Sequence, residues 1–318
     1  MKEAIEELQT KIRQKLLKYN TPRRIVQFLS FIFFSAVIFN LGSLPLLFPV
    51  LWTWGLQQNT VGDAFSAIQF MLSGWESASV VFPWLGVASF LIVGILLGKS
   101  LCGWICPFGF IQELVGFIKR KQNELSPRTH ESLIYIKYFI LALTLFISIT
   151  FSASKIAGAS RGYESALGIF ATAPFTVLSP AETLFATLPR MVRDFANAAL
   201  TGQADLLAGI AGLSPLFWAQ FAIMIGVLVF AAYVPRSWCR YFCPHGAIMA
   251  IMNRFSFLGL QRDPVKCAKG GCRLCVEVCP TRVRILDMPW EKFSDPECIY
   301  CLKCADACPD GAIKLKYP

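Results

Sequence analysis

Long uncharged stretches dominate this chain. They cover residues 25–62, 77–98, 138–154 and 206–235, and a membrane-spanning helix needs about 17 to 25 apolar residues. The 318 residues are 55% hydrophobic and 16% charged, with a mean hydropathy of +0.53, whereas a soluble domain is about 25% charged. We therefore predict an α-helical integral membrane protein, a bundle of four spans at about 25–44, 81–99, 136–154 and 215–234.

A fifth uncharged stretch, at 165–181, competes with this assignment. It contains Pro174 and Pro180, and proline breaks the interior of a helix. We predict a re-entrant or surface segment there, inside a long outer loop at about 155–214. This loop is expected to cap the membrane surface or dock another subunit, and framing a lipid-soluble substrate is a further reading.

The basic residues predict the orientation. Lys and Arg number 7 in 1–24, 6 in 99–137 and 13 in 236–318, but 0 in 41–83 and 4 in 155–214. Because basic loops stay on the cytoplasmic side, we predict that both termini lie in the cytoplasm. The predicted location of the protein is the inner (cytoplasmic) membrane. The net charge of +10 then indicates membrane lipid, and no nucleic acid, as a partner. Residues 1–24 are expected to form a cytoplasmic interfacial helix, and 25–255 the membrane domain.

The C-terminal segment 260–318 carries two cysteine runs, each followed by proline. The second run has the spacing of bacterial ferredoxins, in which the fourth cysteine of one run ligates the other 4Fe-4S cluster. That rule predicts one cluster on Cys267, Cys272, Cys275 and Cys308, and another on Cys298, Cys301, Cys304 and Cys279. Structural zinc is the rival reading, although zinc ribbons do not repeat this spacing. The first run departs from the pattern by two extra residues after Cys267.

The other four of the twelve cysteines belong to an internal repeat. Residues 99–109, KSLCGWICPFG, match 236–246, RSWCRYFCPHG, at an offset of 137. We name Cys102, Cys106, Cys239 and Cys243 the membrane cysteines. Spacing of i and i+4 predicts that the two sulfurs of each pair share one helical face, with the proline ending or kinking the helix. Two facing pairs would supply the four thiolates of a third iron–sulfur cluster. A soft-metal site such as Cu(I), a redox thiol pair and unliganded buried cysteines stay open as alternatives.

These motifs carry two family resemblances. The tail resembles the two-cluster bacterial ferredoxins, which implies a small α+β module of the βαββαβ type with two 4Fe-4S clusters. With the repeated CxxxCP pairs, the chain resembles membrane polyferredoxins of the NapH type, the quinol-dehydrogenase component of periplasmic nitrate reduction, and their CcoG-type and NosR-type relatives. The resemblance implies an iron–sulfur electron-transfer subunit that works between quinol and a partner redox protein, either a ferredoxin-type protein or a cytochrome.

Two other readings concern the chemistry that accompanies electron transfer. A metal reductase or assembly factor would use the membrane cysteines to reduce or deliver copper. Glu113 is a candidate to accept a proton if quinol binds on the inner side, although a surface helix residue is its more ordinary role. His245 could protonate a quinone or ligate a metal, although a hydrogen-bonding residue is its more ordinary role. The chain shows no motif for an organic active site, and no catalytic residue is predicted.

Overall fold

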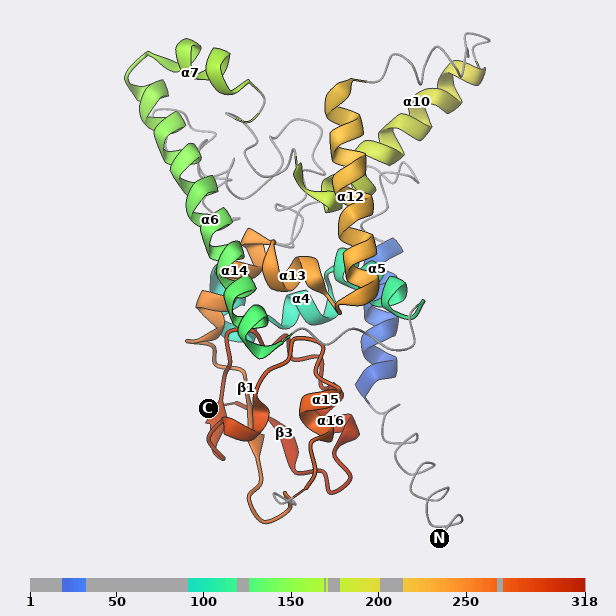
Figure 1. Cartoon of the computed structure of the whole chain (residues 1–318), viewed down its shortest axis with the longest axis vertical. Coiled ribbons are helices and arrows are strands. Elements are labelled where there is room, and N and C mark those ends of the chain that lie inside the picture. The colour runs from blue at the N-terminus through green and yellow to red at the C-terminus, as the bar shows by residue number, and fades with distance from the viewer. Residues whose placement is uncertain are drawn as a thin grey trace.

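The computed structural model describes residues 19–32, 91–118, 126–168, 170, 178–200, 214–267 and 271–317. Most of this part of the chain is helical, and a small sheet lies near the C-terminus (Figure 1). The predicted spans at 25–44 and 81–99 fall largely on residues 33–90, outside the described residues. Of these two spans, the structure describes residues 25–32, within a helix at 19–32, and residues 91–99, of which 91–97 are helical.

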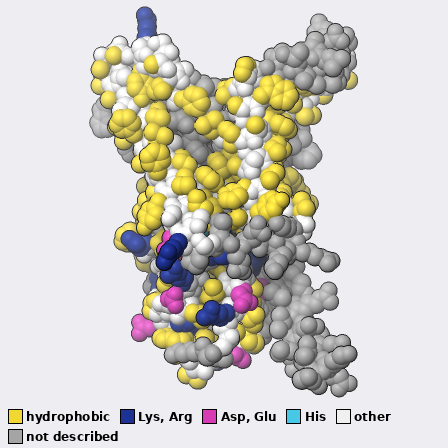
Figure 2. All heavy atoms as spheres, viewed as in Figure 1, with side chains coloured by type: hydrophobic (Ala, Val, Ile, Leu, Met, Phe, Trp, Pro, Cys, Tyr) yellow, Lys and Arg dark blue, Asp and Glu magenta, His cyan; other side chains and the backbone are white. Residues whose placement is uncertain are grey.

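Two helices have the length and hydropathy of membrane spans, and they rise on opposite sides of the upper part of Figure 1. They are α6 (Pro127–Ile156) and α12 (Pro215–Tyr233), in agreement with two of the predicted spans. Ser126 and Ser214 cap them, each hydroxyl accepting a backbone N–H at 3.3 Å, and proline follows as the first helical residue. Hydrophobic side chains cover both helices (Figure 2), including Phe139 and Phe146, which are 69% and 65% exposed.

A layer of short helices lies below these two and above the sheet (Figure 1). It contains α4 (Ser100–Trp104), α5 (Pro107–Gly116), α13 (Ser237–Tyr241) and α14 (Pro244–Asn253). Helix α5 packs on α12, whereas α13 and α14 pack on α6. The layer therefore brings both copies of the internal repeat to the same end of the long helices.

The predicted outer loop is partly helical. It contains α7 (Ser160–Leu167), α9 (Pro180–Glu182), the π-helix η5 (Thr183–Thr187) and α10 (Leu188–Leu200). Pro180 is the first residue of α9, and α9 and η5 pack against α12. Pro174 lies outside the described residues.

The tail forms an antiparallel sheet in the order β2-β1-β3. Strand β1 (Gly259–Arg262) pairs with β2 (Lys292–Phe293) and β3 (Ile313–Lys316), and the helices are α15 (Leu274–Glu277) and α16 (Lys303–Ala307). The βαββαβ pattern calls for a further strand before β2, where the structure has the 3-10 helix η6 (Ile285–Asp287). The Arg262 guanidinium donates to the carbonyls of Leu286 and Met288 at 3.0 and 3.1 Å, so these acceptors need no strand partner.

Candidate iron–sulfur sites

Each CxxxCP motif spans two helices. The first cysteine lies within a five-residue helix, α4 or α13, and the second is the N-cap of the next helix, α5 or α14. Its sulfur accepts the backbone N–H of the motif's glycine, from Gly109 to Cys106 and from Gly246 to Cys243, both at 3.4 Å. The helix break expected at the proline is present, because proline opens the second helix at its first position. The two cysteines of a pair therefore lie in different elements and not on one helical face.

The glycine of each motif lies in a crowded place. A Cβ on Gly246 would approach Cys239 O to 2.9 Å, and one on Gly109 would approach an Arg236 guanidinium nitrogen to 3.1 Å. Glycine therefore allows the two short helices of the second motif to approach each other at Gly246, and allows Arg236 of the second motif to pack on the first motif at Gly109.

The structure brings the membrane cysteines together. Cys239 lies in a buried cluster against which Cys102, Cys106 and Cys243 pack, and these three cysteines each interact electrostatically with Cys239. The neighbouring Cys106, Arg236 and Gln112 lower the pKa of Cys239 against the effect of burial. Burial raises the pKa of Cys102 to about 11 and also raises the pKa of Cys243. Cys239 is thus the membrane cysteine whose thiolate form is most favoured, and thiolates are the metal-binding form of cysteine.

The donor set of this group bears on the kind of centre. Four cysteines against an apolar cluster supply the four thiolates that one 4Fe-4S cluster takes.

Apolar side chains cover this group. Ala181 of α9 and Phe185 of η5 are 7% and 3% exposed and belong to the same buried cluster as Cys239, Phe108 and Trp238. Phe31, from the helix at 19–32, packs edge-on against Phe185 with ring centroids 5.8 Å apart. The segment that follows the predicted re-entrant stretch therefore helps to exclude water from the membrane cysteines.

The tail cysteines form two electrostatic groups. Cys275 interacts with Cys272, Cys267 and Cys308. Cys304 interacts most strongly with Cys301, and then with Cys298, Cys279 and Cys275. Residues from both runs therefore meet in each group.

The cysteine sites of the two halves are joined by direct contacts. Gly103, between two membrane cysteines, lies against Ile299, and a Cβ on Gly103 would overlap Ile299 O. The indole N–H of Trp104 donates to Tyr300 O at 2.8 Å, and Asn253 donates to Cys298 O at 3.1 Å. The segment 298–301 of the tail therefore packs on both copies of the repeat.

Buried ion pairs reinforce this joint. Glu297 pairs with Lys99 at 2.9 Å and with Lys137 of α6, and both lysine side chains are at most 1% exposed. Burial would raise the pKa of Glu297, but the two lysines lower it to about 2. The carboxylate thus stays ionised and ties the tail to α6 and to the start of the first CxxxCP motif.

Glu113 is the centre of a second buried group. It pairs with Arg23, with Arg236 at 2.8 Å and with Lys303 at 3.9 Å. Burial would raise the pKa of Glu113, but these cations lower it to about 2. Glu113 is therefore buried and not the surface residue that its ordinary role would make it. Burial lowers the pKa of His245 to about 4, so its imidazole is neutral at physiological pH.

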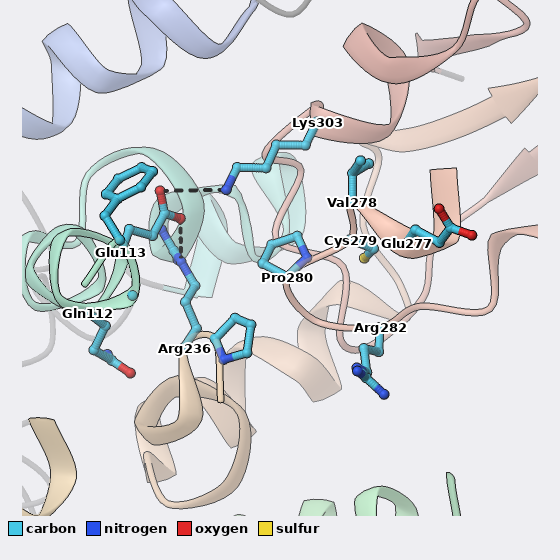
Figure 3. Close-up of a pocket in the computed structure, with 12 residues that line it drawn as sticks. Gln112, Glu113, Arg236, Glu277, Val278, Cys279, Pro280, Arg282 and Lys303 are labelled. Atoms are coloured by element: carbon cyan, nitrogen blue, oxygen red, sulfur yellow. Dashed lines mark hydrogen bonds and ion pairs between the residues drawn. The ribbon is translucent and has the colours of Figure 1, made fainter. Parts of the chain in front are cut away.

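A cavity of about 200 Å³ adjoins Glu113, Arg236 and Lys303, with Cys279 and Pro280 of the tail on its opposite wall (Figure 3). It lies between the membrane domain predicted at 25–255, here called the membrane half, and the ferredoxin tail at 260–318.

Sequence reasoning missed Glu297, Gln112 and Gly103 as residues of the site. The sequence held one signal for Glu297. Its partner Lys137 is a lone charge at the start of an apolar stretch, and such a residue requires an oppositely charged partner. Gln112 and Gly103 act through contacts with residues more than a hundred positions away, and no local pattern indicates them.

Comparison with known proteins supports the iron–sulfur assignment. A family described as a 4Fe-4S binding domain matches residues 80–123 and 216–259, and a second family with the same description matches 293–314. The first family thus covers both CxxxCP motifs, and the second covers the last cysteine run.

Several relatives match most of the chain. The uncharacterized protein MJ0750 of Methanocaldococcus jannaschii is 27% identical over 71% of this chain and 76% of its own. The ferredoxin-type protein NapH of Escherichia coli is 24% identical over 80% of this chain and 74% of its own. The regulatory protein NosR of Pseudomonas aeruginosa is 26% identical over 86% of this chain, which covers only 34% of NosR. No solved structure matches the chain.

The homologues also include "Protein NirI" of Paracoccus denitrificans and "Putative electron transport protein YccM" of Escherichia coli. The matching families are thus named for 4Fe-4S binding, and two of these relatives carry names that refer to electron transport or to ferredoxin. As the CxxxCP and ferredoxin motifs predicted, the chain is a homologue of the NapH- and NosR-type ferredoxin-type membrane proteins.

Proposed function

We propose that this protein is a membrane-bound iron–sulfur subunit that passes electrons between the quinol pool and a partner redox protein. The observation that carries the proposal is the convergence of the four membrane cysteines at one end of α6 and α12, directly against the ferredoxin tail. The relatives' names place them in electron transport or among ferredoxin-type proteins.

Three sets of four cysteines would hold the clusters. The tail sets are Cys267, Cys272, Cys275 and Cys308, and Cys298, Cys301, Cys304 and Cys279. The electrostatic neighbours of Cys275 and Cys304 support this division. The membrane cysteines form the third set, and the match of a 4Fe-4S binding family to both motifs supports it. When bound, such clusters supply one-electron transfer without proton chemistry.

The protein's own residues would shape this function in two ways. The apolar cover from α9, η5 and the helix at 19–32 excludes water from the membrane cysteines. Glu297, Asn253 and Trp104 hold the tail against the first CxxxCP motif and α14, so the segment that contains Cys298 and Cys301 packs directly on the part of the chain that carries the membrane cysteines. Lipid and quinone are then the partners on the membrane side, and a soluble or membrane-bound redox protein is the partner of the tail.

Replacing Cys102 and Cys239 together by alanine tests the function. The intact protein should contain about twelve irons and the variant about eight, because one 4Fe-4S cluster is lost. Quinol should no longer reduce the tail in the variant, whereas dithionite should still reduce it. Unchanged iron content and unchanged quinol-dependent reduction would contradict the proposal. Copper bound in place of about four irons would favour the metal-reductase reading.

Orientation can be tested with single cysteines placed on exposed residues. Ser165 of α7 lies in the predicted outer loop, and Lys314 of β3 lies in the predicted cytoplasmic tail; both are exposed. An impermeant thiol reagent should label Ser165→Cys in intact cells and Lys314→Cys only after the membrane is opened, because basic residues mark the cytoplasmic side. Labelling of Lys314→Cys in intact cells would overturn the predicted topology.

A further inference from the structure

Gln112 connects the two copies of the internal repeat inside the membrane-cysteine site. It belongs to α5, just after the first CxxxCP motif, and is fully buried. Its side-chain nitrogen lies 3.2 Å from the sulfur of Cys239 in the second motif. Of the hydrogen bonds in the described chain, this is the one that reaches a membrane cysteine's sulfur from a side chain other than cysteine.

The orientation of the Gln112 amide follows from its other contacts. Trp238 N lies 3.1 Å from Oε1 of Gln112, and a backbone N–H can only donate. The amide oxygen must therefore face Trp238, which turns the NH₂ group towards Cys239 Sγ and towards Phe108 O at 3.4 Å. Gln112 is thus an N–H donor to this sulfur.

Only one of the two copies of the repeat has this hydrogen-bond donor. At the offset of 137 the residue equivalent to Gln112 is Met249 of α14, which is 1% exposed and has no N–H to offer. Cys102, the equivalent of Cys239, receives no hydrogen bond to its sulfur among the described residues. The other two membrane cysteines accept matching bonds from Gly109 and Gly246, so Gln112 distinguishes Cys239 from its repeat partner.

We propose that Gln112 is a positioning residue that raises the reduction potential of the membrane centre through its N–H···S bond to Cys239. Hydrogen bonds to the sulfurs are among the factors that fix the potential of iron–sulfur clusters. A donor stabilises the more negative, reduced state more than the oxidised one, because negative charge on the sulfur strengthens the bond. This inference rests on the proposed cluster at the membrane cysteines.

Two variants remove the donor. Gln112→Met introduces the uncharged side chain found at the equivalent position of the repeat, and Gln112→Glu keeps an oxygen for Trp238 N but replaces the NH₂ group by a second oxygen, whose negative charge acts in the same direction. Redox titration of the full-length protein, followed by electron paramagnetic resonance, should give a lower midpoint for the membrane centre in both variants. The midpoints of the two tail clusters should not change. A tenfold change in the equilibrium constant for one-electron reduction of the membrane centre corresponds to a midpoint shift of about 59 mV.

The wild-type protein offers a second measurement that needs no variant. With ¹⁵N-labelled glutamine, pulsed paramagnetic resonance of the reduced membrane centre should show a nitrogen coupling, and Gln112→Met should abolish it. An unchanged midpoint in both variants, or no nitrogen coupling in the wild type, would overturn the inference. A wild-type content of about eight irons would instead refute the membrane cluster itself.

Discussion

Replacing Glu297 by glutamine should destabilise the joint between the tail and the membrane half by about 3–5 kcal/mol, because it leaves buried charges without their partner. Lys99 and Lys137 are at most 1% exposed, and both pair with this one carboxylate. Glutamine keeps the shape of the side chain but removes the charge between two ammonium groups. Hydrogen exchange across residues 292–302 should rise, and the thermal midpoint in detergent should fall.

A matched control lies on α6, the helix that carries Lys137. Glu131 of α6 pairs with Arg284 of the tail, but their side chains are 55% and 59% exposed. Exposed pairs contribute about 0–1 kcal/mol, so Glu131→Gln should have little effect on either measurement. Equal effects of the two variants would contradict the role given to burial.

The pH dependence of the same joint follows from Glu297. Burial would raise its pKa, but Lys99 and Lys137 lower it from 4.5 to about 2. A lowered pKa means that the stabilisation is complete above about pH 4.5 and is lost as the pH falls towards 2. In the Glu297→Gln variant this part of the acid sensitivity should disappear.

Gly103→Ala should separate the membrane cysteines from the tail. A Cβ at this position would overlap Ile299 O and lie 3.2 Å from the Ile299 carbonyl carbon, so two backbones must move apart. Overpacking of this kind costs about 1–3 kcal/mol. The Gly103 carbonyl also accepts hydrogen bonds from Arg23 at 2.9 Å and Gln27 at 2.8 Å, and a shift would strain both. We expect a lower thermal midpoint and slower quinol-dependent reduction of the tail.

Gly226 of α12 provides the comparison. Nothing lies within 4 Å of a Cβ placed there, and alanine is favoured over glycine inside a helix by up to about 1 kcal/mol. Gly226→Ala should therefore leave the reduction rate unchanged and the thermal midpoint equal or slightly higher. If Gly103→Ala behaved in the same way, the contact with Ile299 would have no functional weight.

The cysteine pattern and the apolar stretches are local features, and the sequence predicted what depends on them. The two long apolar helices that the structure describes, α6 and α12, were predicted from the hydropathy of the sequence. The grouping of the membrane cysteines followed from the repeat. The path of the chain through each motif could not be predicted from the repeat. Cys106 is the N-cap of α5, and Gly109 packs against Arg236 of the other motif. Such crowding depends on tertiary contacts.

Charged residues were harder to interpret for the same reason. Glu113 reads as an ordinary residue of an amphipathic helix, yet its three cationic neighbours come from the N-terminal helix, the second repeat and the tail. A single sequence does not indicate which distant cations will surround a carboxylate. Burial then decides the outcome, since a buried charge is retained only with partners.

The two copies of the repeat differ in how their basic residues are neutralised. Lys99 and Arg236 occupy equivalent positions three residues before a cysteine, and both are buried. Arg236 finds its carboxylate within the membrane half, at Glu113, whereas the position equivalent to Glu113 is Ala250. Lys99 instead uses Glu297 of the tail. The membrane half is thus electrically incomplete by itself, because without the tail the buried Lys99 and Lys137 would lose the carboxylate that pairs with both.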